Sequence, residues 1–165
     1  MSRFAAFSGK KKLSRPHVLV VDDEAAVRTI ARRMLEPHGY IVEEATDPLQ
    51  ACERAEKKER LDLLVADYRM PELTGGEVAR RIRTAKPSIK VLFITGFPDD
   101  LFNERQALWE GESFLEKPFS QRGLIEAASL LLFGKLNQEQ LFAPDTPAVL
   151  QKPRAWGFTH DRAIS

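Results

Sequence analysis

The amino-acid sequence predicts an α/β domain in which helices cover both faces of a five-stranded parallel sheet. Short apolar runs alternate five times with segments of helical periodicity between residues 17 and 134. The first of them, residues 17–21, is a short β-branched apolar run, which is typical of a buried parallel strand. At this size we expect the strand order 2-1-3-4-5, which makes the first and third strands neighbours.

Each of the five predicted strands contains apolar residues, but some runs predict a strand more clearly than others. Residues 17–21 form the clearest run, because they combine Val18, Val20 and Val21 with Leu19. The second run is the weakest, since it contains only three residues. The predicted strands comprise residues 17–21, 40–42, 61–66, 90–94 and 113–116.

The predicted helices follow from residue spacing and from signals at their ends. Val27, Ile30, Met34 and Leu35 lie three and four positions apart, as one face of a helix requires, and Gly39 ends that segment. Helices are expected over residues 24–37, 76–85 and 99–109, and two more follow the N-caps Asp47 and Ser120 and reach about residue 58 and residue 133 or 134.

Composition indicates a soluble globular protein. The chain has 165 residues, of which 43% are hydrophobic and 30% are charged. No apolar run is long enough to cross a bilayer, and the N-terminus lacks the apolar core of a signal peptide. Cys52 is the only cysteine, so no intrachain disulfide can form. We therefore expect a cytoplasmic protein that does not enter a membrane.

The two ends of the chain differ from its middle, which we expect to form a domain over residues 17–134. Residues 1–16 carry five basic and no acidic side chains. Such an arm could contact nucleic acid or anionic lipid, but we favour a disordered, solvated terminus. Residues 135–165 are proline-containing and partly apolar, and are too short for a recognisable output domain. No helix-turn-helix pattern is present, so direct DNA binding is not expected.

Polar residues end four of the predicted strands. Asp22 and Asp23 follow the first strand, Asp67 follows the third, Thr95 follows the fourth and Lys117 follows the fifth. The carboxyl ends of parallel strands share one edge of a sheet, so we expect these side chains to converge there. Three carboxylates packed together repel one another unless a cation lies among them. A hard divalent cation such as Mg²⁺, or Mn²⁺, suits oxygen ligands of this kind.

Five separate motifs in this order resemble a response-regulator receiver domain of two-component signalling, of the single-domain chemotaxis type. They are Asp22-Asp23, Asp67-Tyr68-Arg69-Met70-Pro71, Gly75, Thr95-Gly96 and Lys117-Pro118-Phe119. The resemblance covers about residues 17–134 and implies a flavodoxin-like fold. Each residue taken singly has an ordinary structural explanation, so the joint pattern carries the interpretation.

The resemblance implies a role for each site residue. Asp67 would accept a phosphoryl group from a phosphohistidine donor. Asp22, Asp23, Asp67 and the backbone carbonyl of Arg69 would bind Mg²⁺. Thr95 and Lys117 would contact the phosphoryl group, and the Lys117-Pro118 peptide bond is expected to be cis.

The resemblance also implies a switch and a control of phosphoryl lifetime. Thr95 would move toward the phosphoryl group and allow Phe114 to turn inward, although Phe114 could instead be a plain core aromatic. Arg69 and Phe97 flank the path of a hydrolytic water, and neither is a general base. We expect slow self-dephosphorylation, with the alternative that both residues serve partner contacts.

The leading functional hypothesis is a single-domain switch that catalyses only its own phosphorylation and dephosphorylation. Its donor would be a sensor histidine kinase or a histidine phosphotransfer protein, and its downstream target is a protein that the sequence does not identify. A phosphate shuttle or sink is an alternative that the sequence does not separate from a switch. A haloacid-dehalogenase-type phosphatase and an unphosphorylated scaffold fit less well. We expect a monomer or a weak homodimer. Ile125, Leu132 and Phe133 could supply an apolar stripe for dimerisation through the last helix, or they could equally be core residues or be covered by the tail.

Overall fold

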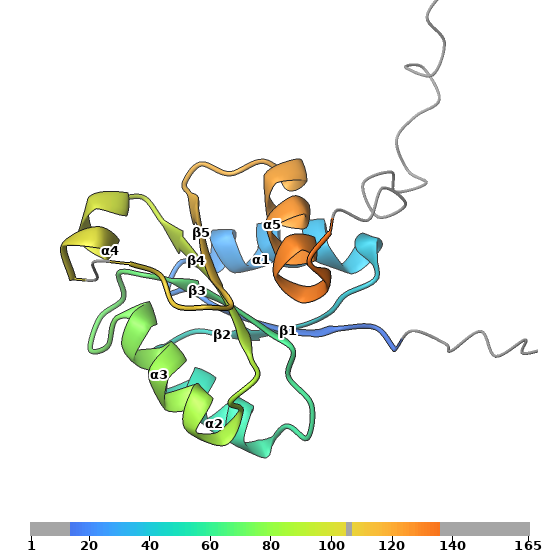
Figure 1. The fold of residues 1–165 in the computed structure, drawn as a ribbon, viewed down its shortest axis with the longest axis horizontal. Coiled ribbons are helices and arrows are strands. Elements are labelled where there is room, and N and C mark those ends of the chain that lie inside the picture. Colours follow the sequence, from blue (N-terminus) through green and yellow to red (C-terminus); the bar gives the residue numbers. More distant parts are fainter. Residues whose placement is uncertain (1–13, 105–106, 136–165) are drawn as a thin grey trace, which may run out of the picture.

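Five parallel strands form one sheet in the order β2-β1-β3-β4-β5, which confirms the predicted topology (Figure 1). The computed structural model describes residues 14–104 and 107–135. The predicted basic arm and the predicted tail therefore lie almost entirely outside the described residues. The strands are β1 (His17–Val21), β2 (Ile41–Ala45), β3 (Leu63–Asp67), β4 (Lys90–Thr95) and β5 (Glu112–Glu116).

Helices cover both faces of the sheet. They are α1 (Ala25–Leu35), α2 (Pro48–Lys57), α3 (Gly75–Ala85), α4 (Pro98–Glu104) and α5 (Gln121–Phe133), with a short 3₁₀ helix η1 (Glu36–His38) after α1. Figure 1 shows α1 and α5 on one face and α2 and α3 on the other. Each face has its own buried apolar cluster, because alternate residues of the strands point to opposite sides.

Side-chain caps begin several helices where the sequence predicts them. The carboxylate of Asp47 accepts a hydrogen bond from the backbone N–H of Gln50 at 2.8 Å. The hydroxyl of Ser120 accepts one from the N–H of Gly123 at 3.1 Å. These bonds satisfy donors that have no partner within the helix. At the other end, Gly134 follows α5 with a φ of 65°, a left-handed conformation that favours glycine.

The buried face of α1 differs from the predicted one. Ile30 is 45% exposed, whereas Arg28, Ala31 and Leu35 form the buried stripe. Arg28 can be buried because its guanidinium donates to a backbone carbonyl at 2.6 Å and pairs with Glu44 at 3.4 Å. A pattern built on apolar residues alone misses such a position.

The predicted helix over residues 99–109 is wrong at its C-terminal end. Helix α4 runs from Pro98 to Glu104, and residues 107–109 are not helical. The N–H of Trp109 donates to the Glu112 carboxylate at 3.0 Å, and the N–H of Glu112 donates to the Trp109 carbonyl at 3.0 Å. This turn, which continues through Gly111 with a φ of 80°, directs the chain into β5 in place of a further helical turn.

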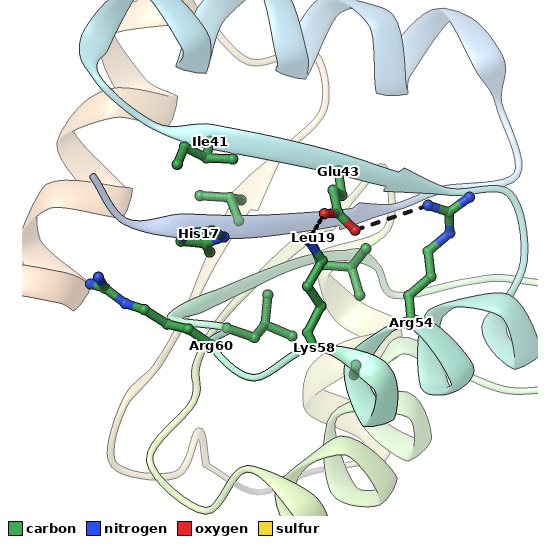
Figure 2. Close-up of a pocket in the computed structure, with 10 residues that line it drawn as sticks. His17, Leu19, Ile41, Glu43, Arg54, Lys58 and Arg60 are labelled. Atoms are coloured by element: carbon green, nitrogen blue, oxygen red, sulfur yellow. Dashed lines mark ion pairs between the residues drawn. The ribbon is translucent and has the colours of Figure 1, made fainter. Parts of the chain in front are cut away.

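Ion pairs fasten α2 to the edge strand β2. Glu43 of β2 pairs with Lys58 and, at 4.0 Å, with Arg54 of α2 (Figure 2). The three residues line a shallow pocket that also contains His17 and Ile41. The basic groups of the pocket nearest to Glu43 are thus already paired, and we assign this pocket a structural role.

Candidate functional site

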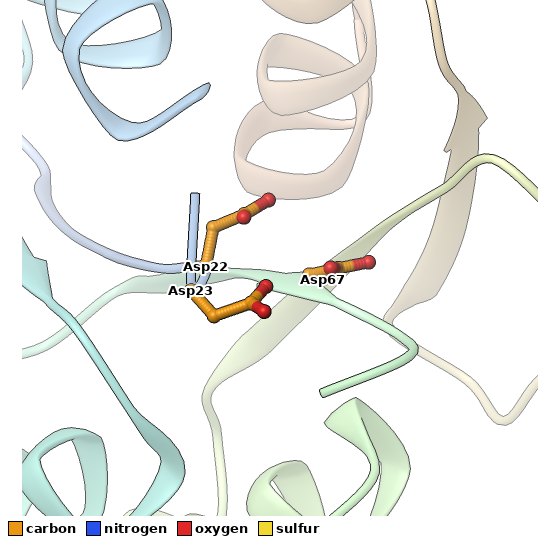
Figure 3. A group of neighbouring side chains, drawn as sticks. All are labelled: Asp22, Asp23 and Asp67. Carbon is orange, nitrogen blue, oxygen red and sulfur yellow. The ribbon is translucent and has the colours of Figure 1, made fainter. Parts of the chain in front are cut away.

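Three carboxylates meet where β1 and β3 end. Asp22 and Asp23 follow β1, and Asp67 is the last residue of β3 (Figure 3). One carboxylate oxygen from each residue lies within 4.8 Å of the others. Val21 and Ala66 are partners in the parallel pairing of β1 and β3, so the strand register itself places the three acids together.

Asp22 is the deepest of the three acids and is held in one orientation. It is 1% exposed, and its carboxylate accepts hydrogen bonds from the N–H of Glu24 at 2.8 Å and from the ammonium of Lys117 at 3.0 Å. Burial nevertheless raises the pKa of Asp22 above its ordinary value. The nearby Lys117 ammonium and the Glu24 N–H therefore offset only part of the cost of burying this charge.

Asp67 is buried and chemically unusual. Burial, followed by the charge of Asp22, raises the pKa of Asp67 to about 6, although Lys117 opposes the shift. Its carboxylate accepts a hydrogen bond from the N–H of Arg69 at 3.3 Å. Near pH 7 the Asp67 carboxylate is thus mostly ionised yet more basic than a solvated aspartate.

Lys117 supplies the positive charge of the site. Its ammonium lies 3.0 Å from Asp22, 3.5 Å from Asp67 and 3.5 Å from Glu24. Burial lowers the pKa of Lys117, but the bond to Asp22 and the neighbouring acids outweigh it and leave the pKa raised. The N–H of Lys117 donates to the Thr95 carbonyl at 2.8 Å, and the Lys117-Pro118 peptide bond is cis.

Thr95 is the last residue of β4 and is buried at the carboxyl-end edge of the sheet, where the three acids also lie. Its hydroxyl accepts a hydrogen bond from the N–H of Phe97 at 3.0 Å. Phe114 of β5 does not belong to either buried cluster, because it is 37% exposed and meets Phe102 of α4 edge to face at 5.3 Å. Phe114 therefore lies outward against α4, and the core alternative does not hold.

Arg69 and Phe97 contact each other at the rim of the site. The guanidinium of Arg69 lies 4.6 Å from the centre of the Phe97 ring and also pairs with Asp100 of α4. The Phe97 ring remains 57% exposed. The two residues thus form one contact between the segment after β3 and the segment after β4.

Sequence reasoning missed Arg28 as a part of the site. Its guanidinium donates to the backbone carbonyl of Asp22 at 2.6 Å and so fixes the turn that carries Asp22 and Asp23. The available signal was its spacing, because Arg28 precedes Ala31 and Leu35 by three and seven residues on the buried face of α1.

The donor set fits a hard divalent cation. All three acids offer oxygen ligands, and burial together with the charges of Asp22 and Asp23 raises the pKa of Asp67. A single ammonium from Lys117 does not balance three carboxylates. The cluster can therefore bind a divalent cation of the Mg²⁺ or Mn²⁺ type and present the Asp67 carboxylate beside it.

Comparison with known proteins agrees with this geometry. Residues 18–129 match the family model described as response regulator receiver domain. "Sensor kinase CckA" of Brucella abortus is 36% identical over 116 residues, which cover 70% of this chain and 12% of that protein. "Response regulator MprA" of Mycobacterium leprae is 38% identical over 117 residues, which cover 70% of this chain and 50% of MprA. The chain thus spans half the length of these curated relatives, or less.

Solved structures extend the likeness to three dimensions. The receiver domain of the hybrid histidine kinase CckA has 33% identity and a TM-score of 0.61, over 70% of this chain and 98% of that one. A response regulator receiver protein from Sinorhizobium medicae has 28% identity and a TM-score of 0.65, over 73% and 96%. Among the described residues, no helix is both long and apolar enough to cross a bilayer.

Proposed function

The chain belongs to the response regulator receiver domain family, and from this premise we propose that Asp67 accepts a phosphoryl group from a phosphohistidine donor. The observation that carries the proposal is the Asp67 carboxylate, buried at the shared edge of β1 and β3 with Lys117 3.5 Å away. An oxygen of Asp67 would attack phosphorus, the bond from phosphorus to the histidine nitrogen would break, and an acyl phosphate would form. The family is not one of classical enzymes, and the reaction would modify only the protein itself.

The ionisation of Asp67 suits this chemistry. A carboxylate with a pKa of about 6 is ionised at pH 7 and is a better nucleophile than an ordinary aspartate. The Lys117 ammonium lies close to both Asp22 and Asp67, so it can stabilise the negative charge that develops on the transferred phosphoryl group. The Thr95 hydroxyl, which now accepts a bond from Phe97, has a proton to donate to a phosphoryl oxygen.

We assign the metal site of the proposal to Asp22, Asp23, Asp67 and the backbone carbonyl of Arg69. Bound Mg²⁺ or Mn²⁺ would neutralise charge on the phosphoryl oxygens. Arg28 and Glu24 support this site from behind, because they hold the carbonyl and the carboxylate of Asp22 at 2.6 and 2.8 Å. Loss of either support would weaken the cation site without removing a ligand.

The proposed output is a change of the surface formed by α4 and β5. Thr95 would turn its hydroxyl toward the phosphoryl group, and Phe114 would leave Phe102 and move inward behind Thr95. Phe114 is outward and half-exposed in this structure, which supports its assignment as the moving partner. The receiver would then act on a protein target, with a sensor histidine kinase or a histidine phosphotransfer protein as the donor.

Helix α5 exposes little of the apolar stripe that was expected to support a dimer. Ile125 is fully buried and packs in the core, and Leu132 is partly buried against it, so the expected apolar stripe is reduced to the half-exposed Phe133. Leu130 and Phe133 are the large apolar side chains of α5 that remain exposed, and we propose a monomer in solution, because two such side chains do not make a stable interface.

Phosphorylation with a small-molecule phosphodonor such as acetyl phosphate tests the proposal directly. The wild-type protein should gain the mass of one phosphoryl group when Mg²⁺ is present, and Asp67→Asn should gain none. Chelation of Mg²⁺ should abolish the gain. If the wild type gains no phosphoryl group from this donor or from a panel of phosphohistidine donors, the scaffold interpretation replaces the receiver function.

A further inference from the structure

Two side chains that directly follow the phosphoacceptor reach across to helix α4. The hydroxyl of Tyr68 donates to the Glu104 carboxylate at 2.6 Å, and the guanidinium of Arg69 pairs with Asp100. Asp100 lies in the first turn of α4, and Glu104 is its last residue. We call these four residues, Tyr68, Arg69, Asp100 and Glu104, the α4 clasp.

The clasp ties a weakly anchored helix to a firmly anchored segment. Tyr68 is 2% exposed, its ring meets Phe93 edge to face at 5.5 Å, and its N–H donates to the Ile94 carbonyl at 3.0 Å. In contrast, α4 has seven residues, of which only Leu101 is buried. Little apolar burial holds the helix, so polar contacts at its two ends contribute much of its positioning.

The clasp also lies on both sides of the proposed phosphoryl site. The N–H of Arg69 donates to the Asp67 carboxylate at 3.3 Å, which links the clasp to the phosphoacceptor. The Phe97 ring lies under the Arg69 guanidinium, and the N–H of Phe97 donates to the Thr95 hydroxyl at 3.0 Å. A change at Asp67 therefore reaches Arg69 through one hydrogen bond, and a change at Thr95 reaches it through the hydrogen bond to Phe97 and then the ring contact.

We propose that the α4 clasp couples phosphorylation of Asp67 to the position of α4, with Tyr68 and Arg69 acting as positioning residues. This inference rests on the proposed phosphorylation. A phosphoryl group carries up to two negative charges and three acceptor oxygens, and it would form two residues before Arg69. It would compete with the single carboxylate of Asp100 for the guanidinium. Release of Asp100 would free the first turn of α4 and leave the Tyr68–Glu104 hydrogen bond as the remaining contact of the clasp.

Hydrogen exchange of the α4 backbone tests the positioning role without any phosphodonor. Tyr68→Phe removes only the hydroxyl, and Asp100→Asn removes the charge that pairs with Arg69. Both variants should exchange α4 amide protons several-fold faster than the wild type. Asp99→Asn is the matched control, because Asp99 is exposed on the same turn and forms no ion pair with any residue of the described ranges. Equal exchange in the wild type and in both clasp variants would overturn the proposal.

Titration with beryllofluoride in the presence of Mg²⁺ tests the coupling, because this anion mimics a phosphoryl group. If the closed clasp opposes the phosphorylated arrangement, Tyr68→Phe and Asp100→Asn should bind the analogue roughly two- to tenfold more tightly than the wild type, while Asp99→Asn should not. Unchanged affinities in the two clasp variants would overturn the coupling alone. Failure of the wild type to bind beryllofluoride or to accept a phosphoryl group would overturn the proposed function together with the coupling.

Discussion

At the scale of single residues, we expect Phe97 and Arg69 at the rim of the site to control how water approaches an acyl phosphate on Asp67. Both side chains are exposed, and the Arg69 guanidinium lies over the Phe97 ring. Neither group accepts a proton from water at neutral pH. We propose that the Phe97 ring slows hydrolysis by its position at this rim and that Arg69 contributes by holding the ring.

Replacement of Phe97 by alanine should shorten the lifetime of the phosphorylated protein. Loss of the ring opens the rim and releases Arg69, and we expect decay to accelerate by roughly two- to tenfold, which is about 0.4–1.4 kcal/mol of barrier. Loss of phosphorylated mass with time after removal of the donor gives the rate. Phe133→Ala is the matched control, since Phe133 is half-exposed at the far end of α5. A wild-type decay rate in Phe97→Ala would show that the ring does not shield the phosphorus.

At the scale of secondary structure, the start of α3 is packed directly against the end of β3. Thr74 and Glu77 form a reciprocal capping box, in which each side chain accepts the other residue's backbone N–H. Gly75 follows the cap, and a Cβ there would come inside van der Waals distance of the Asp67 carbonyl and lie 3.1 Å from the Tyr68 Cα. Only glycine allows the helix to begin so close to Asp67.

Gly75→Ala should therefore cost stability through this contact. Because backbone atoms oppose the new methyl group, we expect the free energy of unfolding to fall by about 1–3 kcal/mol. Urea denaturation measures the change. Gly96→Ala is the control, because a Cβ at Gly96 meets nothing within 4 Å. Equal losses in the two variants would mean that the general preference for glycine, and not the approach to Asp67, sets the cost.

Element boundaries show where sequence reasoning succeeds and where it stops. The strand order was predictable because apolar runs alternated with helical spacing and because the acids ended neighbouring strands. The end of α4 was not, since the turn at Trp109 and Glu112 depends on side-chain bonds between residues with no distinctive pattern. The burial of Arg28 was missed for a similar reason, as its partners lie on the β1–α1 turn and on β2. Tertiary hydrogen bonds of this kind override local propensity.

At the scale of the whole molecule, the buried acid cluster lowers the free energy of unfolding at neutral pH. The pKa of Asp67 is about 6 in the folded state against an ordinary value of 3.8, so the folded state binds its proton more tightly than the unfolded state does. The resulting destabilisation is absent below about pH 4, grows between about pH 4 and pH 6, and is complete above that range. It amounts to as much as about 3 kcal/mol in the absence of a divalent cation.

Asp67→Asn should thus stabilise the Mg²⁺-free protein. At pH 7 we expect its free energy of unfolding to exceed that of the wild type by about 1–3 kcal/mol, and the gain should disappear near pH 4. Added Mg²⁺ should raise the unfolding temperature of the wild type and reduce the difference between the two proteins. Denaturation at several pH values, with and without Mg²⁺, measures both effects. A gain that is independent of pH would rule out ionisation of the buried Asp67 carboxylate as its cause.

The sheet order also has a kinetic consequence. Val21 pairs with Ala66 across a helix, the strand β2 and a second helix, so the three acids come together only after a long loop has closed. An unfolded or half-folded chain presents no such cluster to a divalent cation. If β1 and β3 dock after the folding transition state, Mg²⁺ should change only the unfolding rate. It should slow unfolding and leave the folding rate unchanged. The cation would then prolong the life of the folded protein without helping it to form.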